Sequence, residues 1–317
     1  MAAKSKKTKK SEKVGGNGKA KATTSSKKQQ RPQLNFNTSW DYAPAPEKTN
    51  HIDLQNTYNH FIGGKFEAPE KGNYMATHNP ATEEKLADVA NGTKEDVHKA
   101  VQAAHEGYDK YWRKMRPKDR AKYVFRIARL IQERAREFSV VETLDNGKPI
   151  RETRDMDIPV SASWYFHYAG WADKLKYAFT GHDPEPVGVC GQIIPWNFPF
   201  MMAAWKLAPA LACGNTTVLK PAETTPLTAL KLAELIREAD LPPGVVNIVT
   251  GAGDTGSSLF QHPDIRKLAF TGSTEVGKLI QKEAAGTDKD LTLELGGKAA
   301  HLIFDDAPLD QAVEGIV

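Results

Sequence analysis

"VGVCGQIIPWNFPFMMAAWKLAPALACGNTTVLKPAE", residues 187–223, is the segment from which the fold class of this chain can be predicted. It begins with an apolar run of strand type at 187–195, continues with a helical segment at 200–214, and ends with a second strand at 215–221. Continuous Val and Ile runs are typical of strands that are covered on both faces. A strand, a helix and a strand in this order predict parallel pairing through a right-handed crossover.

The same alternation continues toward the carboxyl end. Helices are predicted at 225–240, 255–262 and 274–286, and strands at 245–251, 267–272, 291–297 and 299–307. This pattern predicts an α/β fold with a doubly wound, Rossmann-like parallel sheet, an architecture that binds nucleotides beyond the carboxyl ends of its strands.

Upstream of this region the sequence predicts short strands between His60 and Asn91, joined by Gly and Pro turns. Helices are expected at 93–112, 117–144 and 158–175, and Thr93 with Asp96 fits a capping box at the start of the first. The aromatic residues of the third helix are interpreted as core or interface packing, with a ligand site as the alternative.

The basic charge of the chain belongs to its amino-terminal segment. Residues 1–31 hold 11 of the 43 Lys and Arg residues, with Glu12 as the only acid, whereas the remainder is mildly acidic. We expect residues 1–50 to be a disordered basic tail and linker, because they contain too few apolar side chains to form a core. A solvated tail is the favoured interpretation, and an arm that contacts nucleic acid or an acidic partner is the alternative.

The remaining composition indicates a cytoplasmic protein. No stretch approaches the roughly 20 apolar residues that cross a bilayer, and residues 1–31 lack the features of a signal or transit peptide. Two cysteines, Cys190 and Cys213, are too few for a disulfide framework.

Candidate cofactor residues follow the predicted strands. "GAGDTG" at 251–256 matches a phosphate-binding glycine pattern, but the acidic residue expected about 20 positions later is not at the end of a strand. Glu223 follows the second strand, where a carboxylate can accept from both hydroxyls of an adenosine ribose, and Lys220 can reach the same sugar. Because Glu223 would repel a 2′-phosphate, NAD is favoured over NADP. A surface glutamate is the alternative interpretation.

Three further positions suit chemistry on a bound ligand. Ser273 or Thr274 would cap a helix whose amino terminus can receive a pyrophosphate, or a helix that needs no ligand. Asn197, between the two prolines of "IPWNFP", could donate to a developing oxyanion or satisfy its own turn. Glu294, in "LTLELGG", has apolar neighbours that would raise its pKa toward general-base work, unless its head lies in water.

The ordered set "IPWNFP", "LKPAE", "FTGSTEVG" and "LELGGK" resembles the NAD(P)-dependent aldehyde dehydrogenase superfamily, from about Phe61 to the last residue. The resemblance implies an NAD-binding domain at 51–296 with a short oligomerisation arm near 173–187, and the start of a truncated catalytic domain at 297–317. It also implies an aldehyde substrate and a homo-oligomer of the full-length protein. We expect no metal site, and no membrane partner because no apolar stretch is long enough.

The resemblance assigns roles to individual residues. Asn197 would be an oxyanion-hole donor and Glu294 the general base, while Lys220 and Glu223 would hold the adenine ribose. Ser273 would meet the pyrophosphate. The further cofactor-binding residues that it implies are Ile193, Ile194, Pro195, Trp196, Gly253, Gly256, Phe270, Thr271, Gly272, Leu295 and Gly296.

The implied reaction is oxidation of an aldehyde to a carboxylic acid with hydride transfer to NAD, through a thiohemiacetal and a thioester. The nucleophilic cysteine of the family is expected beyond Val317, and neither Cys190 in a strand nor Cys213 at a packing position replaces it. We therefore expect this chain to be inactive alone. The alternative is a non-catalytic nucleotide-fold scaffold whose basic tail binds nucleic acid or acidic partners.

Overall fold

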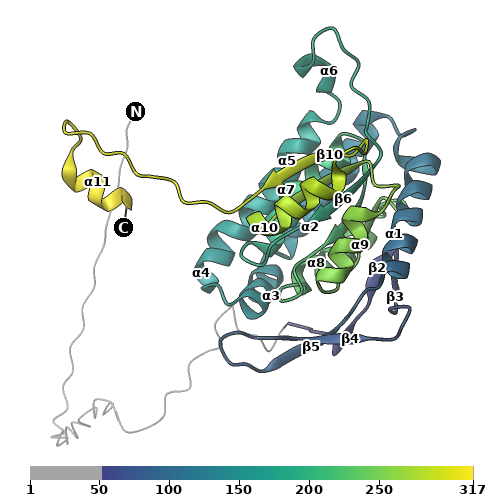
Figure 1. Cartoon of the computed structure of the whole chain (residues 1–317), viewed down its shortest axis with the longest axis horizontal. Helices are drawn as coiled ribbons and strands as arrows, with labels where there is room; N and C mark the ends of the chain where they lie inside the picture. The colour runs from purple at the N-terminus through teal and green to yellow at the C-terminus, as the bar shows by residue number, and fades with distance from the viewer. Residues whose placement is uncertain (1–51, 317) are drawn as a thin grey trace, which may run out of the picture. The chain divides into compact units, whose positions relative to one another are not determined.

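The computed structural model describes residues 52–316 of the 317-residue chain (Figure 1). The tail and linker expected at 1–50 lie outside these residues. Among residues 52–316, no helix is long and apolar enough to cross a membrane.

A seven-stranded sheet has the order β10-β9-β6-β7-β8-β2-β3. The five strands that come from the second half of the chain pair in parallel. This arrangement confirms the predicted doubly wound fold. The five strands are β6 (Val189–Ile193), β7 (Thr216–Lys220), β8 (Val246–Ile248), β9 (Lys267–Thr271) and β10 (Asp290–Glu294).

The short strands expected near the amino end also form. β2 (His60–Ile62) and β3 (Lys65–Glu67) extend the large sheet as an antiparallel hairpin beside β8. β1 (Thr57–Tyr58), β5 (Lys85–Ala90) and β4 (Tyr74–His78) form a separate three-stranded sheet, at the bottom of the view in Figure 1.

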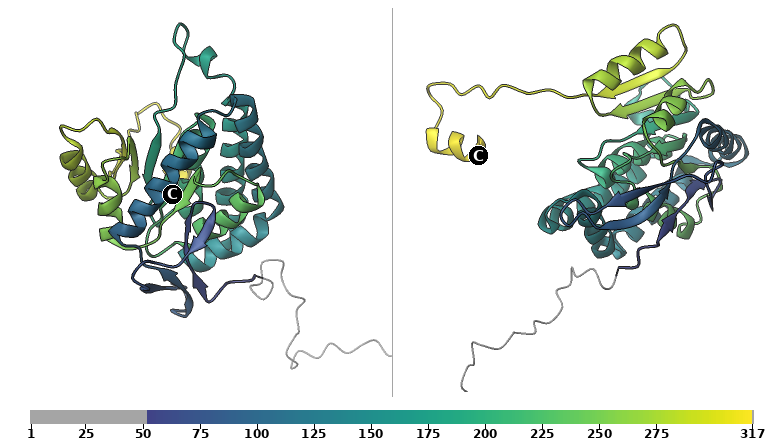
Figure 2. Two further views of the ribbon diagram at one scale, coloured as in Figure 1. Left: turned by 90° about the vertical axis from the view of Figure 1, so that its right-hand side faces the viewer. Right: turned by 60° about the horizontal axis from the view of Figure 1, so that its bottom comes forward.

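Helices cover both faces of the large sheet, as Figure 2 shows. One face packs against α1 (Lys94–Gly107), α9 (Gly253–Gln261) and α10 (Thr274–Ala284) around the apolar cluster that contains Val218 and Leu268. The other packs against a larger apolar cluster that contains α2 (Pro117–Glu133), α3 (Ala135–Asn146), α5 (Ile158–Trp171), α7 (Pro199–Ala212) and α8 (Leu227–Glu238). The remaining helical segments are η2 (Tyr108–Trp112), α4 (Ile150–Glu152), η3 (Thr153–Asp157), α6 (Leu175–Ala178) and α11 (Leu309–Ile316).

Several predicted elements were wrong in extent. The helix expected at 117–144 breaks at Arg134, whose backbone leaves the helical region (φ −105°, ψ 18°) while its side chain pairs with Glu137 and Glu234. The helix expected at 158–175 ends at Trp171, and a separate α6 follows. The strand expected at 299–307 does not form: no described strand pairs with this segment, and unpaired backbone does not make a sheet.

Candidate active site

The carboxyl ends of β6, β7, β9 and β10 open onto one cavity of about 1330 Å³. This is the rim where parallel α/β sheets bind ligands. All sixteen residues proposed from the sequence line it, although this placement does not test their roles. They are Ile193, Ile194, Pro195, Trp196, Asn197, Lys220, Glu223, Gly253, Gly256, Phe270, Thr271, Gly272, Ser273, Glu294, Leu295 and Gly296.

Lys220 and Glu223 form an ion pair at the end of β7. Lys220 Nζ lies 3.1 Å from Glu223 Oε2, with the lysine side chain 5% exposed and the glutamate 52% exposed. Burial lowers the pKa of Lys220, and Glu223 opposes that shift. Partial burial acts to raise the pKa of Glu223, but hydrogen bonding and the Lys220 ammonium outweigh burial and lower this pKa. The pair therefore offers ammonium donors and a carboxylate acceptor side by side at the cavity wall.

The start of α9 forms a smooth part of the wall. A side chain at Gly253 would meet no other atom within 4 Å, and a Cβ at Gly256 would lie 3.9 Å from Ile193 Cδ1. The absence of side chains leaves a surface on which a flat ring can pack.

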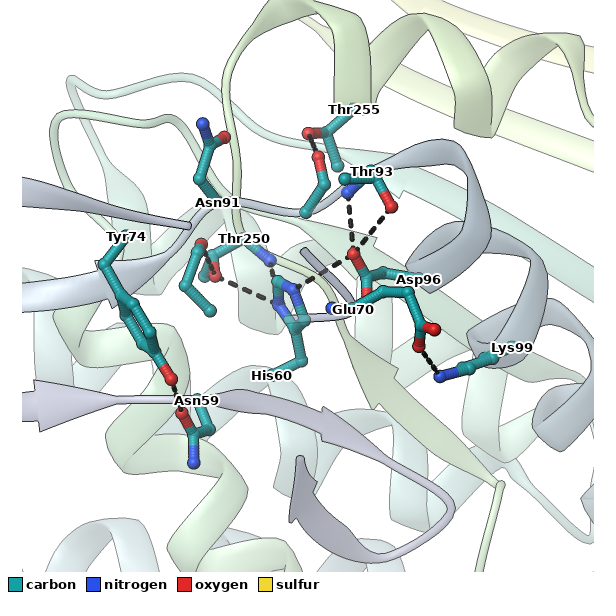
Figure 3. A network of polar contacts seen from close by, with 12 residues as sticks. Asn59, His60, Glu70, Tyr74, Asn91, Thr93, Asp96, Lys99, Thr250 and Thr255 are labelled. Carbon is teal, nitrogen blue, oxygen red and sulfur yellow. Dashed lines mark hydrogen bonds and ion pairs between the residues drawn. The ribbon is translucent and has the colours of Figure 1, made fainter. Parts of the chain in front are cut away.

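A buried polar network fixes the loop that leads into α9 (Figure 3). Thr250 N–H donates to His60 Nδ1 (3.3 Å), and the Thr250 hydroxyl donates to the Ala90 carbonyl (2.6 Å). The Thr250 hydroxyl oxygen also lies 3.2 Å from His60 Nδ1, and His60 Nε2 faces Asp96 Oδ2 at 3.9 Å. Burial lowers the pKa of His60 to about 4, against the opposing charge of Asp96, so the imidazole is neutral.

Asp96 closes this network at the amino end of α1. It accepts from the Thr93 N–H (2.8 Å) and hydroxyl (2.9 Å) and from the Glu70 N–H (2.9 Å). The capping box predicted for Thr93 and Asp96 is thereby confirmed. Burial acts to raise the pKa of Asp96, but these hydrogen bonds lower it below its ordinary value. The carboxylate therefore stays ionised.

Ser273 caps α10, as the sequence predicts, by accepting from the Val276 N–H at 3.3 Å. A Cβ at Gly272, just before it, would lie 2.5 Å from Cζ of Phe270, so a side chain there would require the Phe270 ring to shift. Gly272 N–H donates to the Glu294 carbonyl (3.0 Å), which ties the start of α10 to the end of β10. The helix presents its amino terminus at the cavity.

The turn between β6 and α7 carries Asn197 into the cavity wall. Trp196 is 63% exposed and Asn197 is exposed as well. Within residues 52–316 the Asn197 side chain forms no hydrogen bond, so its amide is available to a ligand.

Glu294 is exposed, which corrects the apolar surroundings expected for it. Side chains alternate between the two faces of a strand, so its neighbour Leu293 points to the α9 and α10 side while Glu294 and Thr292 face the cavity. The expectation was wrong because residues next to each other in a strand point to opposite faces of the sheet.

Lys206 is the main residue that the motifs missed. Its ammonium donates to Thr271 Oγ1 (2.8 Å), and Thr271 is the cross-strand partner of Glu294. Burial lowers the pKa of Lys206 to about 8, and the charge of Glu294 opposes the shift. A lysine in the otherwise apolar helix 200–214 was the signal that could have identified it.

The cavity also extends beyond the predicted set, toward α7 and the exposed face of β9 and β10. The additional lining residues there include Tyr168, Cys190, Gln192, Met202, Trp205, Cys213, Lys267 and Thr292. Burial raises the pKa of Cys190 to about 12 and also raises that of Cys213. Neither thiol is a ready nucleophile near neutral pH.

Comparison with known proteins gives a consistent result. Residues 66–317 match the model of the "Aldehyde dehydrogenase family". Over 284 residues the chain is 46% identical to "Retinal dehydrogenase 2" of Homo sapiens, covering 85% of this chain and 54% of that protein. It is 48% identical over 268 residues to "Aldehyde dehydrogenase, mitochondrial" of Rattus norvegicus, covering 80% of this chain and 51% of that protein.

A solved structure agrees in fold. The NAD⁺ complex of aldehyde dehydrogenase from Bacillus cereus superimposes with a TM-score of 0.79 at 44% identity, covering 83% of this chain and 55% of that one. The chain thus spans about half the length of the relatives that it matches.

Proposed function

This chain belongs to the aldehyde dehydrogenase family, and from that premise we propose that it forms the NAD-binding part of an enzyme that oxidises aldehydes to carboxylic acids. The observation that carries the proposal is the convergence of the sixteen motif residues on one cavity at the carboxyl rim of the sheet.

The residues at this rim fit NAD. Lys220 has three N–H donors, and Glu223 is its ion-pair partner in the described chain, so donors remain for ribose hydroxyls. The adenine would pack on the open backbone at Gly253 and Gly256, and the pyrophosphate would meet the amino terminus of α10 at Ser273. Glu223 would repel the 2′-phosphate of NADP, which favours NAD.

The remaining cofactor-binding residues would complete the site. Ile193, Ile194, Pro195 and Trp196 lie at the end of β6, and Phe270, Thr271 and Gly272 at the end of β9. Leu295 and Gly296 follow β10. Together they would enclose the nucleotide between two strand ends and the start of α10.

Two residues would act on the substrate. The Asn197 amide would donate to the aldehyde oxygen as negative charge develops on it. Glu294 would take a proton from the water that releases the acid. NAD, when bound, supplies the hydride acceptor. Neither cysteine of this chain suits nucleophilic attack, so we expect the chain alone to bind NAD and to oxidise no aldehyde.

The domain division predicted above is part of this proposal: an NAD-binding domain at 51–296 and the start of a catalytic domain at 297–317. The segment near 173–187 would be the oligomerisation arm. Tyr177 and Phe179 in it are 72% and 53% exposed, apolar surface that a neighbouring subunit would cover. Location in the cytoplasm stays a prediction.

Calorimetric titration tests the cofactor proposal. We expect NAD to bind the chain with one site and NADP to bind more weakly. Glu223→Ala removes charge-assisted hydrogen bonds worth about 1.5–3 kcal/mol, a loss of roughly ten- to a hundredfold in NAD affinity. Glu133→Ala, an exposed glutamate on α2, is the matched control and should bind NAD like the wild type. Equal affinities for the wild type and Glu223→Ala would contradict the assignment. NADH formed from NAD and an aldehyde by this chain would contradict its expected inactivity.

A further inference from the structure

The turn that carries Asn197 lies between two prolines, at positions 195 and 199. Residues 196–198 bend between β6 and α7 and form neither helix nor strand. The prolines at 195 and 199 fix their own φ angles but remove two backbone donors, which leaves fewer hydrogen bonds to hold residues 196–198 between them. Precise placement matters here, because an oxyanion donor acts through a preorganised position.

One short segment of the chain supplies contacts to this turn. The end of α3 and the residues after it, 142–148, contact the turn at 196–198 twice and the start of α7 once. Asn146 Nδ2 donates to the Trp196 carbonyl. The Lys148 ammonium lies 3.6 Å from the centre of the Phe198 ring. Glu142 Oε1 accepts from the Phe200 N–H at 3.1 Å, in the first turn of α7. The three contacts bracket Asn197 on both sides.

Lys148 is held in turn by a buried carboxylate. Its ammonium lies 2.5 Å from Asp157 Oδ2, with the side chains 18% and 0% exposed. The other oxygen, Asp157 Oδ1, is buried and has no hydrogen-bond partner among residues 52–316, so the carboxylate depends on Lys148. The ammonium thus contacts both the Asp157 carboxylate and the Phe198 ring. An ammonium at this distance from a ring is attracted by the negative charge of the ring face.

Gly147 makes this arrangement possible. It ends α3 with φ +82°, a left-handed conformation that reverses the chain and delivers Lys148 to the turn. A side chain at Gly147 would also lie 2.6 Å from Cγ of Pro80.

We propose that Lys148 is a positioning residue. Its ammonium, paired with Asp157, forms a cation–π contact with the ring of Phe198 and so fixes the turn that holds Asn197. The inference rests on the proposed role of Asn197. Lys148 does not line the cavity, so it would act on the substrate only through Phe198 and the turn.

The test compares two variants that remove the contact between Lys148 and Phe198 in different ways. Phe198→Leu removes the aromatic face but leaves the Lys148–Asp157 pair intact. Lys148→Met with Asp157→Asn removes both charges together, because removing Lys148 alone would leave a buried carboxylate without its partner. Lys148→Arg keeps a cation that can stack on the ring, and it serves as the conservative rescue.

The readout is the NMR order parameter of the Asn197 backbone amide in protein labelled with ¹⁵N-asparagine, measured without nucleotide or aldehyde. In the wild type and in Lys148→Arg we expect a rigid value of about 0.85, and in the two disrupting variants a value below about 0.6. Asn247, buried at β8, is the internal reference and should stay rigid throughout. Phe125→Leu, which removes an exposed ring on α2, is the matched control and should leave Asn197 rigid.

An order parameter for Asn197 that stays at the wild-type value in Phe198→Leu overturns the proposal. The proposal is also overturned if the order parameter of Asn247 falls together with that of Asn197 in the disrupting variants, since that result would indicate a general increase in mobility. Phe198→Leu decides the question if the double variant does not fold. Because the measurement uses no NAD, a failure of this proposal is distinguishable from a failure of the NAD titration.

Discussion

Glu142 is a carboxylic acid enclosed by the protein. Its oxygens accept from the Thr228 hydroxyl (2.7 Å) and the Phe200 N–H (3.1 Å). Burial raises its pKa to about 7, and these two hydrogen bonds only partly offset the shift. The predicted helix at 117–144 gave no sign that Glu142 is buried, because hydrophobic periodicity alone does not reveal a glutamate that the core encloses.

This pKa predicts a pH-dependent effect of Glu142→Gln. A folded-state pKa above the unfolded value stabilises the protein fully below about pH 4.5, and that stabilisation is lost as the pH rises through about 7. The glutamine side chain of the variant does not titrate, so the stability of the wild type relative to the variant should fall by up to about 3 kcal/mol between about pH 4.5 and pH 8. Urea unfolding of both proteins across this range measures it. A difference that is constant with pH would show that Glu142 titrates alike in the folded and unfolded states.

The sequence placed Lys220, Glu223 and Ser273 correctly at strand and helix ends, whereas their roles toward a cofactor stay predictions. The prediction was wrong about the surroundings of Glu294, which depend on the face of the strand, and it missed Lys206, which reaches the cavity from a helix. Side-chain direction and contacts across elements were the information that the motifs lacked.

At the scale of elements, α1 approaches the loop before β8 more closely than any side chain would allow. A Cβ on Gly107, the last residue of α1, would lie 2.6 Å from the backbone carbon of Gly244 and 2.8 Å from the Pro243 carbonyl oxygen. Gly170, on the exposed side of α5, would meet nothing within 4 Å.

These two glycines predict opposite results for the same substitution. Gly107→Ala forces backbone apart and should lower the free energy of unfolding by about 1–3 kcal/mol. Gly170→Ala should raise it by about 0.5–1 kcal/mol, because alanine favours a helix. Urea denaturation of both variants measures the changes. Equal effects of the two substitutions would mean that the close approach of α1 carries no packing cost.

Element prediction succeeded where the apolar pattern and the turn residues agreed, as in the β6–α7–β7 unit. It was wrong where tertiary contacts decide. At the helix break, Arg134 forms ion pairs with glutamates of α8, and a local sequence pattern does not predict such contacts. The strand predicted at 299–307 has the right composition and no strand to pair with in the described chain.

At the scale of the whole molecule, the order of the motifs predicted that their residues meet at one rim of a parallel sheet. Parallel strands place their carboxyl ends on the same edge, so sequence positions far apart become neighbours. The size of the cavity and its extension toward α7 could not be predicted, because they depend on how helices pack over the sheet.

A crystal structure of this chain grown with NAD would show where the nucleotide binds. We expect the adenine ribose within hydrogen-bonding distance of Lys220 and Glu223, the pyrophosphate against Ser273 at the start of α10, and the nicotinamide toward Asn197 and Glu294. NAD bound at another place, or in this cavity with its ribose away from Glu223, would contradict this expectation.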